Sequence, residues 1–95
     1  MHIITRKRLN EFAQKYRNTQ ASLEHWYRLV KRGRFRPFAE LRTAFPHADQ
    51  VGKLTIFNIS GNKARLITAI HYNRQKVYIP AVLTHDEYNK SKWKE

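Results

Sequence analysis

The hydrophobic period changes halfway along this chain, and that change limits the possible folds more than any other feature. In the first half, apolar residues recur twice at the spacing of one helical face. The two sets are Leu9, Phe12, Ala13 and Tyr16, then Leu23, Trp26, Tyr27 and Val30. Asn18 and Thr19 separate them, and Gly33 stands where a glycine often follows a helix end. The first half therefore predicts a helix hairpin whose opposite face is basic.

The second half is rich in β-branched residues and is divided by turn residues. Three strands are predicted, at Leu54–Ile59, Ala64–His71 and 76–83. Short turns at 60–62 and 72–75 make consecutive strands antiparallel neighbours. On the third strand, one face is predicted to carry Val77, Ile79, Ala81 and Leu83.

Shorter elements complete the prediction. Ile3 and Ile4 suggest a first strand, Pro37 opens a short helix that Pro46 ends, and the segment 46–52 has turn chemistry without periodicity and predicts an ordered loop. Thr84 and Glu87 match a capping box and start a short C-terminal helix. The class is α+β, a single domain over 1–95, with an N-terminal strand and a helix hairpin packed on a small antiparallel sheet.

Nineteen Lys and Arg residues against seven Asp and Glu give a net charge of +12. This charge favours nucleic acid as a partner, because basic side chains displace counterions from phosphates. An anionic membrane surface and an acidic protein are the alternatives. No segment is a long apolar run, so a spanning helix is not expected. The chain has no cysteine, which excludes disulfides and thiolate metal sites. The N-terminus lacks the apolar region of a signal peptide, and a cytoplasmic protein is expected.

The order of elements resembles the RelE-type toxin fold, and the residues themselves resemble the HigB toxin family. The similarity lies in the segments 38–49, 57–66 and 82–88, together with the pair Trp26-Tyr27. Its most specific parts are the Asn-x-x-Gly-Asn-x-x-Arg segment that ends at Arg65 and the Thr-His-x-x-Tyr segment that ends at Tyr88.

The resemblance implies an activity, partners and a mechanism. HigB-type toxins are ribosome-dependent messenger RNA endonucleases that need no metal. A HigA antitoxin with a helix-turn-helix domain holds them inactive, and their complexes usually oligomerise through that antitoxin. One departure is Pro80, where similar proteins usually carry a basic residue. Proline belongs on an edge strand or at a bulge, so we expect it to bend the strand and to remove one phosphate contact.

Metal-free RNA cleavage uses the 2′-hydroxyl as nucleophile, and it needs a proton acceptor, a proton donor and positive charge around the phosphate. Arg65 lies on the middle predicted strand, where Leu66, Thr68 and Ile70 occupy the opposite phase, and Lys63 shares the face of Arg65. A guanidinium fork suits phosphate oxygens. Arg65 is therefore a candidate catalytic residue, and the alternative is a solvated strand arginine.

His85 and Tyr88 stand three positions apart at the start of the terminal helix, hence on one face. A histidine titrates in the range needed for acid–base work, and a tyrosine can stack on a base or relay a proton. The alternative is that His85 merely follows the cap and Tyr88 packs the helix. With the resemblance, both are candidate catalytic residues.

The remaining candidates are RNA- or phosphate-binding residues. They are Lys53, Asn58, Asn62 and Lys63 around the first predicted hairpin, and the basic cluster Lys31, Arg32, Arg34 and Arg36, a predicted footprint on ribosomal RNA. Asn62 also fits as a plain turn residue. The five histidines show no metal-ligand spacing, so neither a metal nor another cofactor is expected.

Three classes of function fit the charge. The first is the endoribonuclease. The second is a non-catalytic basic RNA-binding module, or a toxin-like protein that has lost activity. The third is a protein-interaction domain for an acidic partner, and a DNA-reading module fits least because no recognition helix stands out. Only an enzyme needs Arg65, His85 and Tyr88 at one phosphate, so the sequence favours the metal-independent endoribonuclease.

Overall fold

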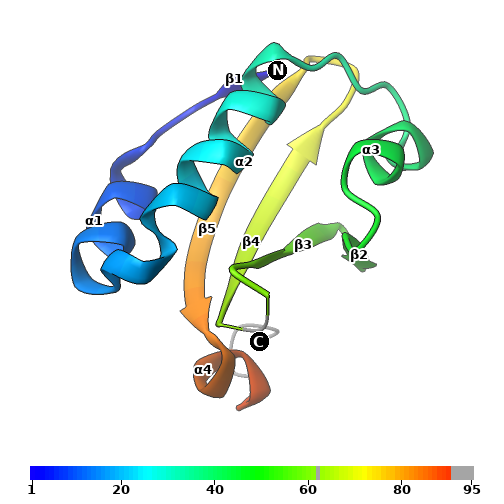
Figure 1. Cartoon of the computed structure of the whole chain (residues 1–95). Coiled ribbons are helices and arrows are strands. Elements are labelled where there is room, and N and C mark those ends of the chain that lie inside the picture. Colours follow the sequence, from blue (N-terminus) through cyan, green and yellow to red (C-terminus); the bar gives the residue numbers. More distant parts are fainter. Residues whose placement is uncertain (62, 91–95) are drawn as a thin grey trace.

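The computed structural model describes residues 1–61 and 63–90. Within them, helices cover one side of a five-stranded sheet, and a short helix follows the last strand (Figure 1). The elements in chain order are β1 (His2–Ile3), α1 (Lys7–Lys15), a 3-10 turn (Arg17–Thr19), α2 (Gln20–Arg32), α3 (Phe38–Ala44), β2 (Asp49–Val51), β3 (Leu54–Ile59), β4 (Ala64–His71), β5 (Lys76–Thr84) and α4 (His85–Asn89). The predicted α+β class, the helix hairpin and the terminal helix are confirmed.

The strands lie in the order β1-β5-β4-β3-β2. The predicted antiparallel meander is confirmed for β3, β4 and β5. β1 adds a parallel edge, with His2 opposite Lys76 and Ile3 opposite Val77. It begins one residue earlier than Ile3 and Ile4 suggested. Two residues carry no signal of strand direction, so only the packing of the helix hairpin that follows β1 decides where it pairs.

The segment after Pro46 departs from the prediction of a loop. Asp49–Val51 forms β2, which pairs antiparallel with the start of β3 in a tight hairpin through Gly52. Gly52 has φ of 59°, the left-handed region that glycine adopts at no steric cost. The prediction failed because β2 has three residues, of which Asp49 and Gln50 are exposed, so no alternation marks it as a strand.

A β-bulge in β5 explains the position of Pro80. Ile79 and Pro80 both lie opposite Thr68 of β4. A bulge accepts a proline because one ladder donor is already missing there. Beyond it Leu83 is the partner of Arg65, on the face away from the helices, whereas Ile79 is 4% exposed and lies in the core. The predicted single face of this strand is therefore wrong beyond Pro80.

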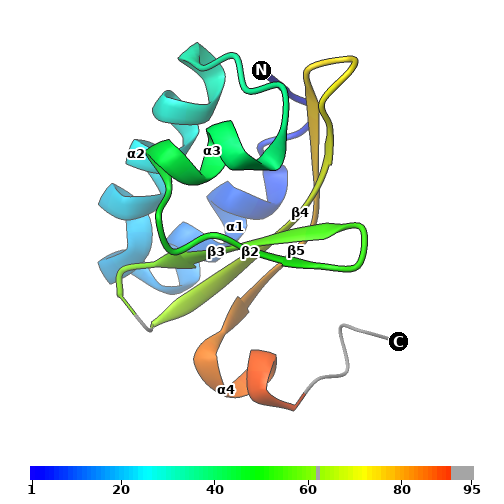
Figure 2. The same ribbon diagram turned by 90° about the vertical axis from the view of Figure 1, so that its right-hand side faces the viewer.

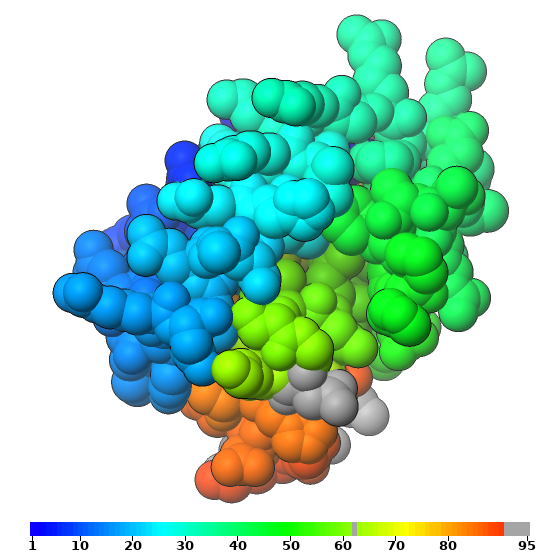
Figure 3. Space-filling model, in the orientation of Figure 1, coloured from blue at the N-terminus to red at the C-terminus, as the bar shows by residue number. Residues whose placement is uncertain are grey.

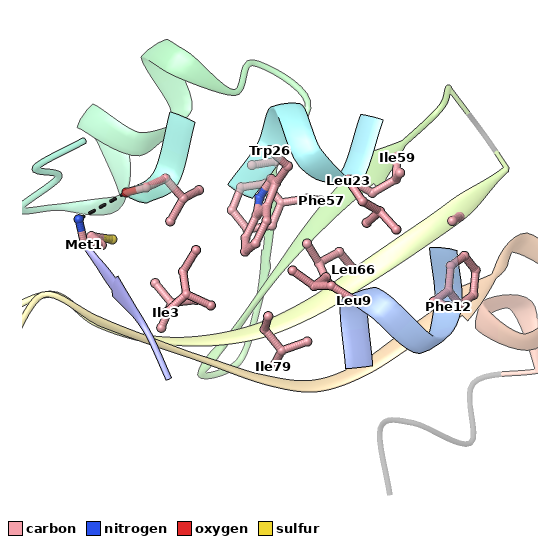
Figure 4. Packing of buried hydrophobic residues seen from close by; sticks show 14 of the residues in the cluster. Met1, Ile3, Leu9, Phe12, Leu23, Trp26, Phe57, Ile59, Leu66 and Ile79 are labelled. Carbon is pink, nitrogen blue, oxygen red and sulfur yellow. Dashed lines mark hydrogen bonds between the residues drawn. The ribbon is translucent and has the colours of Figure 1, made fainter. Parts of the chain in front are cut away.

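The core fills the space between α2 and the inner face of the sheet, as Figure 4 shows. Trp26 meets Phe57 edge to face, with ring centroids 5.4 Å apart. Val30 and Leu66 are fully buried beside them. Each such side chain contributes about 1.5–3 kcal/mol through removal from water. The backbone nitrogen of Met1 donates to the carbonyl of Val30 at 3.1 Å, which anchors β1 against α2.

Two of the predicted helix signals have different outcomes. Thr84 accepts a hydrogen bond from the N–H of Glu87, and the Glu87 side chain accepts one from the N–H of Thr84, so the capping box is confirmed. Gly33 does not adopt a left-handed conformation, because its φ is −78° and its ψ is 154°. Its missing side chain matters instead, since a Cβ there would overlap the Phe35 ring.

Figure 2 shows that α1, α2 and α3 lie on one side of the sheet and leave the other side open, with α4 at the end of β5. The candidate catalytic side chains lie on this open face and on α4.

No helix within the described residues is long and apolar enough to span a bilayer.

Candidate active site

Arg65 and Asn58 lie directly opposite each other on β4 and β3. Their neighbours Leu66 and Phe57 are buried against the helices, so alternation places both on the open face, which was predicted for Arg65. The Arg65 side chain is half-buried and that of Asn58 is exposed. Arg65 Nη1 also donates to the carbonyl of Ala64 at 3.2 Å, which holds the guanidinium close to the strand.

The end of β5 delivers α4 to Arg65. Thr84 is the β5 partner of Ala64, so the first residue of α4 follows one position later, next to Arg65. Arg65 Nη2 lies 3.4 Å from His85 Nδ1. The Arg65 guanidinium carbon lies 5.4 Å from the centre of the Tyr88 ring, a cation–π contact. The three candidate catalytic residues thus meet, although His85 is exposed and Tyr88 half-buried.

Asn89 belongs to the same cluster, and the sequence reasoning missed it. Its side-chain amide lies 3.1 Å from His85 Nε2, so both ring nitrogens of His85 have a neighbour. The available signal was the spacing of four residues between His85 and Asn89, which places them on one helical face. The residue type did not indicate a functional site, because asparagine is common at helix ends.

Among the described residues close to this cluster, Glu87 is the one carboxyl whose pKa is shifted. The hydrogen bond from the N–H of Thr84 lowers the pKa of Glu87. Burial opposes this shift, and the Thr84 hydroxyl, Lys15 and Lys90 support it. Glu87 is therefore ionised at neutral pH and holds the first turn of α4 in place. The cap fixes the start of the helix that carries His85 and Tyr88.

The other predicted residues of the first hairpin have different positions. Lys63 is exposed directly before β4, two residues from Arg65. Asn62 lies outside the described residues. Lys53 sits in the turn between β2 and β3 rather than at the start of a strand. It is five residues from Asn58, about 16 Å along β3, so the structure does not bring Lys53 to Arg65.

The basic cluster lies at the opposite pole of the molecule from α4 (Figure 3). It occupies the end of α2 and the segment that follows, and all four of its basic side chains are exposed: Lys31, Arg32, Arg34 and Arg36. β4 separates the two poles by roughly 23 Å, the length of eight residues in a strand. A cavity of about 600 Å³ opens beside the cluster, and Arg74 and Tyr27 also line it. This surface is separate from the Arg65 site.

Metal ligands are the last candidate class. Within residues 1–61 and 63–90, no group of three or more His, Cys, Asp or Glu side chains is placed to hold an ion. The described site instead consists of an arginine, a histidine, a tyrosine and two asparagines, which are groups for hydrogen bonding, proton transfer and phosphate binding.

Comparison with known proteins gives a consistent result. Residues 19–91 match the family model of HigB_toxin, described as the RelE-like toxic component of a toxin-antitoxin system. The chain is 34% identical over 92 residues to a protein of Escherichia coli K12 named mRNA interferase toxin HigB, covering 94% of this chain and 88% of that protein. It is 33% identical over 93 residues to mRNA interferase HigB of Escherichia coli O6:H1, covering 95% and 90% respectively. The mRNA interferase HigB of Shigella flexneri is also 34% identical over 92 residues, with 94% and 88% coverage.

Proposed function

The chain belongs to the HigB toxin family, the RelE-like toxic component of toxin–antitoxin systems, and we propose that it is a metal-independent endoribonuclease that cuts messenger RNA on the ribosome. Cleavage of translated messages would stop protein synthesis and arrest growth. A reaction on translating ribosomes also takes place in the cytoplasm.

The convergence of Arg65, His85 and Tyr88 carries this proposal. The guanidinium lies 3.4 Å from the His85 imidazole and 5.4 Å from the Tyr88 ring, although β4 and α4 are separate elements. A protein that only bound RNA would gain as much affinity from basic side chains spread over the sheet. Grouping a phosphate ligand with a titratable ring serves proton transfer at one phosphate.

Each side chain has a role in the proposed reaction. Arg65, supported by Lys63, stabilises the negative charge that develops on the phosphate as the 2′-oxygen attacks phosphorus. His85 moves the proton of the 2′-hydroxyl, because an imidazole is effective near neutral pH. Tyr88 stacks on a base or relays a proton, and Asn58 orients the nucleotide across the open face. The bond from phosphorus to the 5′-oxygen breaks, which leaves a cyclic phosphate and a 5′-hydroxyl.

The wider RNA contacts follow the distribution of charge. We assign the cluster Lys31, Arg32, Arg34 and Arg36 to ribosomal RNA, because it lies too far from Arg65 to hold the same phosphate. Lys53 would contact the RNA backbone away from the cut, and Asn62 is assigned to RNA binding from the sequence alone. A site with no strong base of its own gains from a ribosome that arranges the substrate, since orientation lowers the barrier.

The proposed partner is a HigA-type antitoxin with a helix-turn-helix domain. A toxin of this family requires an antitoxin, and the net charge of +12 favours an acidic surface on it. Any larger assembly would form through the antitoxin.

Induced expression in a bacterial host tests the proposal. Wild type, Arg65→Ala and the exposed control Arg42→Ala are produced at equal soluble levels, and new 5′ ends of messages are mapped. We expect growth arrest and cuts inside translated frames for wild type and Arg42→Ala. Arg65→Ala should lose at least about 100-fold in cleavage, the usual effect of removing one electrostatic stabiliser. A reporter message without a start codon should remain uncut.

Intact messages and normal growth with folded wild-type protein would contradict the enzyme. Retention of ribosomal RNA by that protein would then favour a non-catalytic RNA-binding module or a toxin-like protein that has lost activity. Pro80 would be the first residue to replace with a basic one. Full cleavage by Arg65→Ala would overturn the site assignment alone.

A further inference from the structure

The contact between Arg65 and His85 restricts how the imidazole carries its proton. An arginine side chain has five N–H donors and no acceptor. Because Arg65 Nη2 lies 3.4 Å from His85 Nδ1, the contact favours the tautomer in which Nδ1 accepts and has no hydrogen. A neutral imidazole then carries its hydrogen on Nε2. The opposite tautomer would place two donors face to face, one of them charged.

The same argument fixes the amide of Asn89. The atom that faces His85 Nε2 at 3.1 Å is Asn89 Nδ2, and an N–H on Nε2 cannot donate to another donor. A half-turn of the amide about its last torsion brings Oδ1 to this position with the same shape and the same neighbours. Nε2–H then donates to Oδ1, and both ring nitrogens of His85 have a partner of the correct kind.

We propose that Asn89 is a positioning residue that holds His85 in the tautomer protonated at Nε2, so that Nδ1 is the proton acceptor of the reaction. This inference rests on the proposed endoribonuclease. It assigns Nδ1 of His85 as the atom that accepts the proton, and it adds Asn89 to the site. The arrangement follows a general pattern in which a base is oriented by a third group behind it.

The substrate phosphate binds the Arg65 guanidinium, which turns from His85 and frees the lone pair of Nδ1. Nδ1 accepts the proton of the 2′-hydroxyl while the 2′-oxygen forms a bond to phosphorus. The bond from phosphorus to the 5′-oxygen breaks, that oxygen takes a proton from water, and the imidazolium returns its proton to the hydroxide that forms. Asn89 Oδ1 continues to accept from Nε2–H and favours the imidazolium that forms.

Nuclear magnetic resonance tests the tautomer without any cleavage. Protein with nitrogen-15 in its histidines gives different shifts for a protonated and an unprotonated ring nitrogen, and His85→Gln identifies the His85 signals. We expect the Nε2–H form in wild type and in Asn89→Asp, which keeps an acceptor oxygen. Because Arg65 also favours this form, Asn89→Leu should keep it as the major tautomer with a measurable share of the Nδ1–H form, and that share should increase in Arg65→Ala/Asn89→Leu. The control Asn10→Leu changes an exposed asparagine on α1 and should leave the His85 signals unaltered.

Cleavage of ribosome-bound message supplies the second measurement. Asn89→Leu should lose about 10-fold, a part of the roughly 100- to 10,000-fold that general acid–base catalysis contributes. Asn89→Asp should recover most of that loss, whereas a purely structural role would not depend on the oxygen. A wild-type ring protonated at Nδ1, or equal activity in Asn89→Leu and wild type, would overturn this inference while cleavage stands. Absence of cleavage in wild type with the Nε2–H tautomer present would contradict the proposed function instead.

Discussion

The backbone N–H of His85 donates to the carbonyl of Lys63 at 3.2 Å. This bond joins the first residue of α4 to the residue directly before β4, so the helix and the strand that carry the site are held in register. Arg65 lies two residues after Lys63, and its side chain contacts the His85 ring. The position of α4 therefore decides whether the candidate site is assembled.

Loss of the α4 cap should reduce activity more than stability. Thr84→Ala removes the hydroxyl that accepts from the N–H of Glu87, which costs the helix about 1 kcal/mol. α4 buries none of its residues, so the melting temperature of the whole protein should fall by only a few degrees. Cleavage should fall severalfold, because His85 and Tyr88 lose their fixed positions.

Hydrogen exchange of the His85 amide, measured beside cleavage and melting, checks this expectation. Thr84→Ser keeps the hydroxyl and should behave like wild type. A fall in activity no greater than the loss of folded protein would show that α4 has no special role in the site.

The order of α4 should depend on pH through Glu87. Its pKa is lowered from the ordinary value of 4.5, first by the hydrogen bond from the N–H of Thr84. A lowered folded pKa means a stabilisation that is complete above the unfolded value and is lost as the pH falls through the folded value. We expect the Thr84 amide proton shift to titrate below pH 4.5. In Glu87→Gln this titration should disappear, and a midpoint at or above 4.5 in wild type would contradict the assigned cause.

The basic pole should control binding to the ribosome without affecting the chemical step. The double variant Arg32→Gln/Arg34→Gln should lower the dependence of log affinity on log salt concentration by about 2, one per lost phosphate contact. The rate at saturating ribosome should not change, because the cluster lies at the far end of β4 from Arg65. Titration of ribosomes at several salt concentrations measures both.

A control with equal charge shows whether position matters. Lys7→Gln/Arg8→Gln removes the same two charges from exposed positions at the start of α1. It should leave the salt dependence near that of wild type. Equal weakening by both double variants would mean that net charge, rather than the basic pole, drives association.

The chemistry of the cut ends should identify the nucleophile. Attack by the 2′-hydroxyl leaves a cyclic phosphate and a 5′-hydroxyl, and a single 2′-deoxy nucleotide at the mapped position should block cleavage there. Chelation of transition metals at constant Mg²⁺, which ribosomes need, should leave the rate unchanged. A 5′-phosphate, cleavage of the deoxy message, or loss of activity on chelation would contradict the metal-free mechanism.

Some of the candidate site could be predicted from the sequence. Arg65 and Asn58 are found on the open face because strand alternation is a local property that neighbouring apolar residues reveal. The Thr84 and Glu87 cap was equally readable, since both partners lie within four residues of each other. These inferences needed only the chemical nature and spacing of nearby residues, together with the resemblance to a known family.

Other features were decided by contacts between distant segments. The parallel pairing of β1, the short β2 and the bulge at Pro80 depend on which strand lies alongside, and no local period encodes that choice. The sequence alone determined the α+β class, the basic surface and the residue types suited to a phosphate. Only the tertiary structure brought Asn89 and Arg65 to the two nitrogens of His85 and separated the basic pole from them, because the direction of a hydrogen bond exists only once both partners are placed.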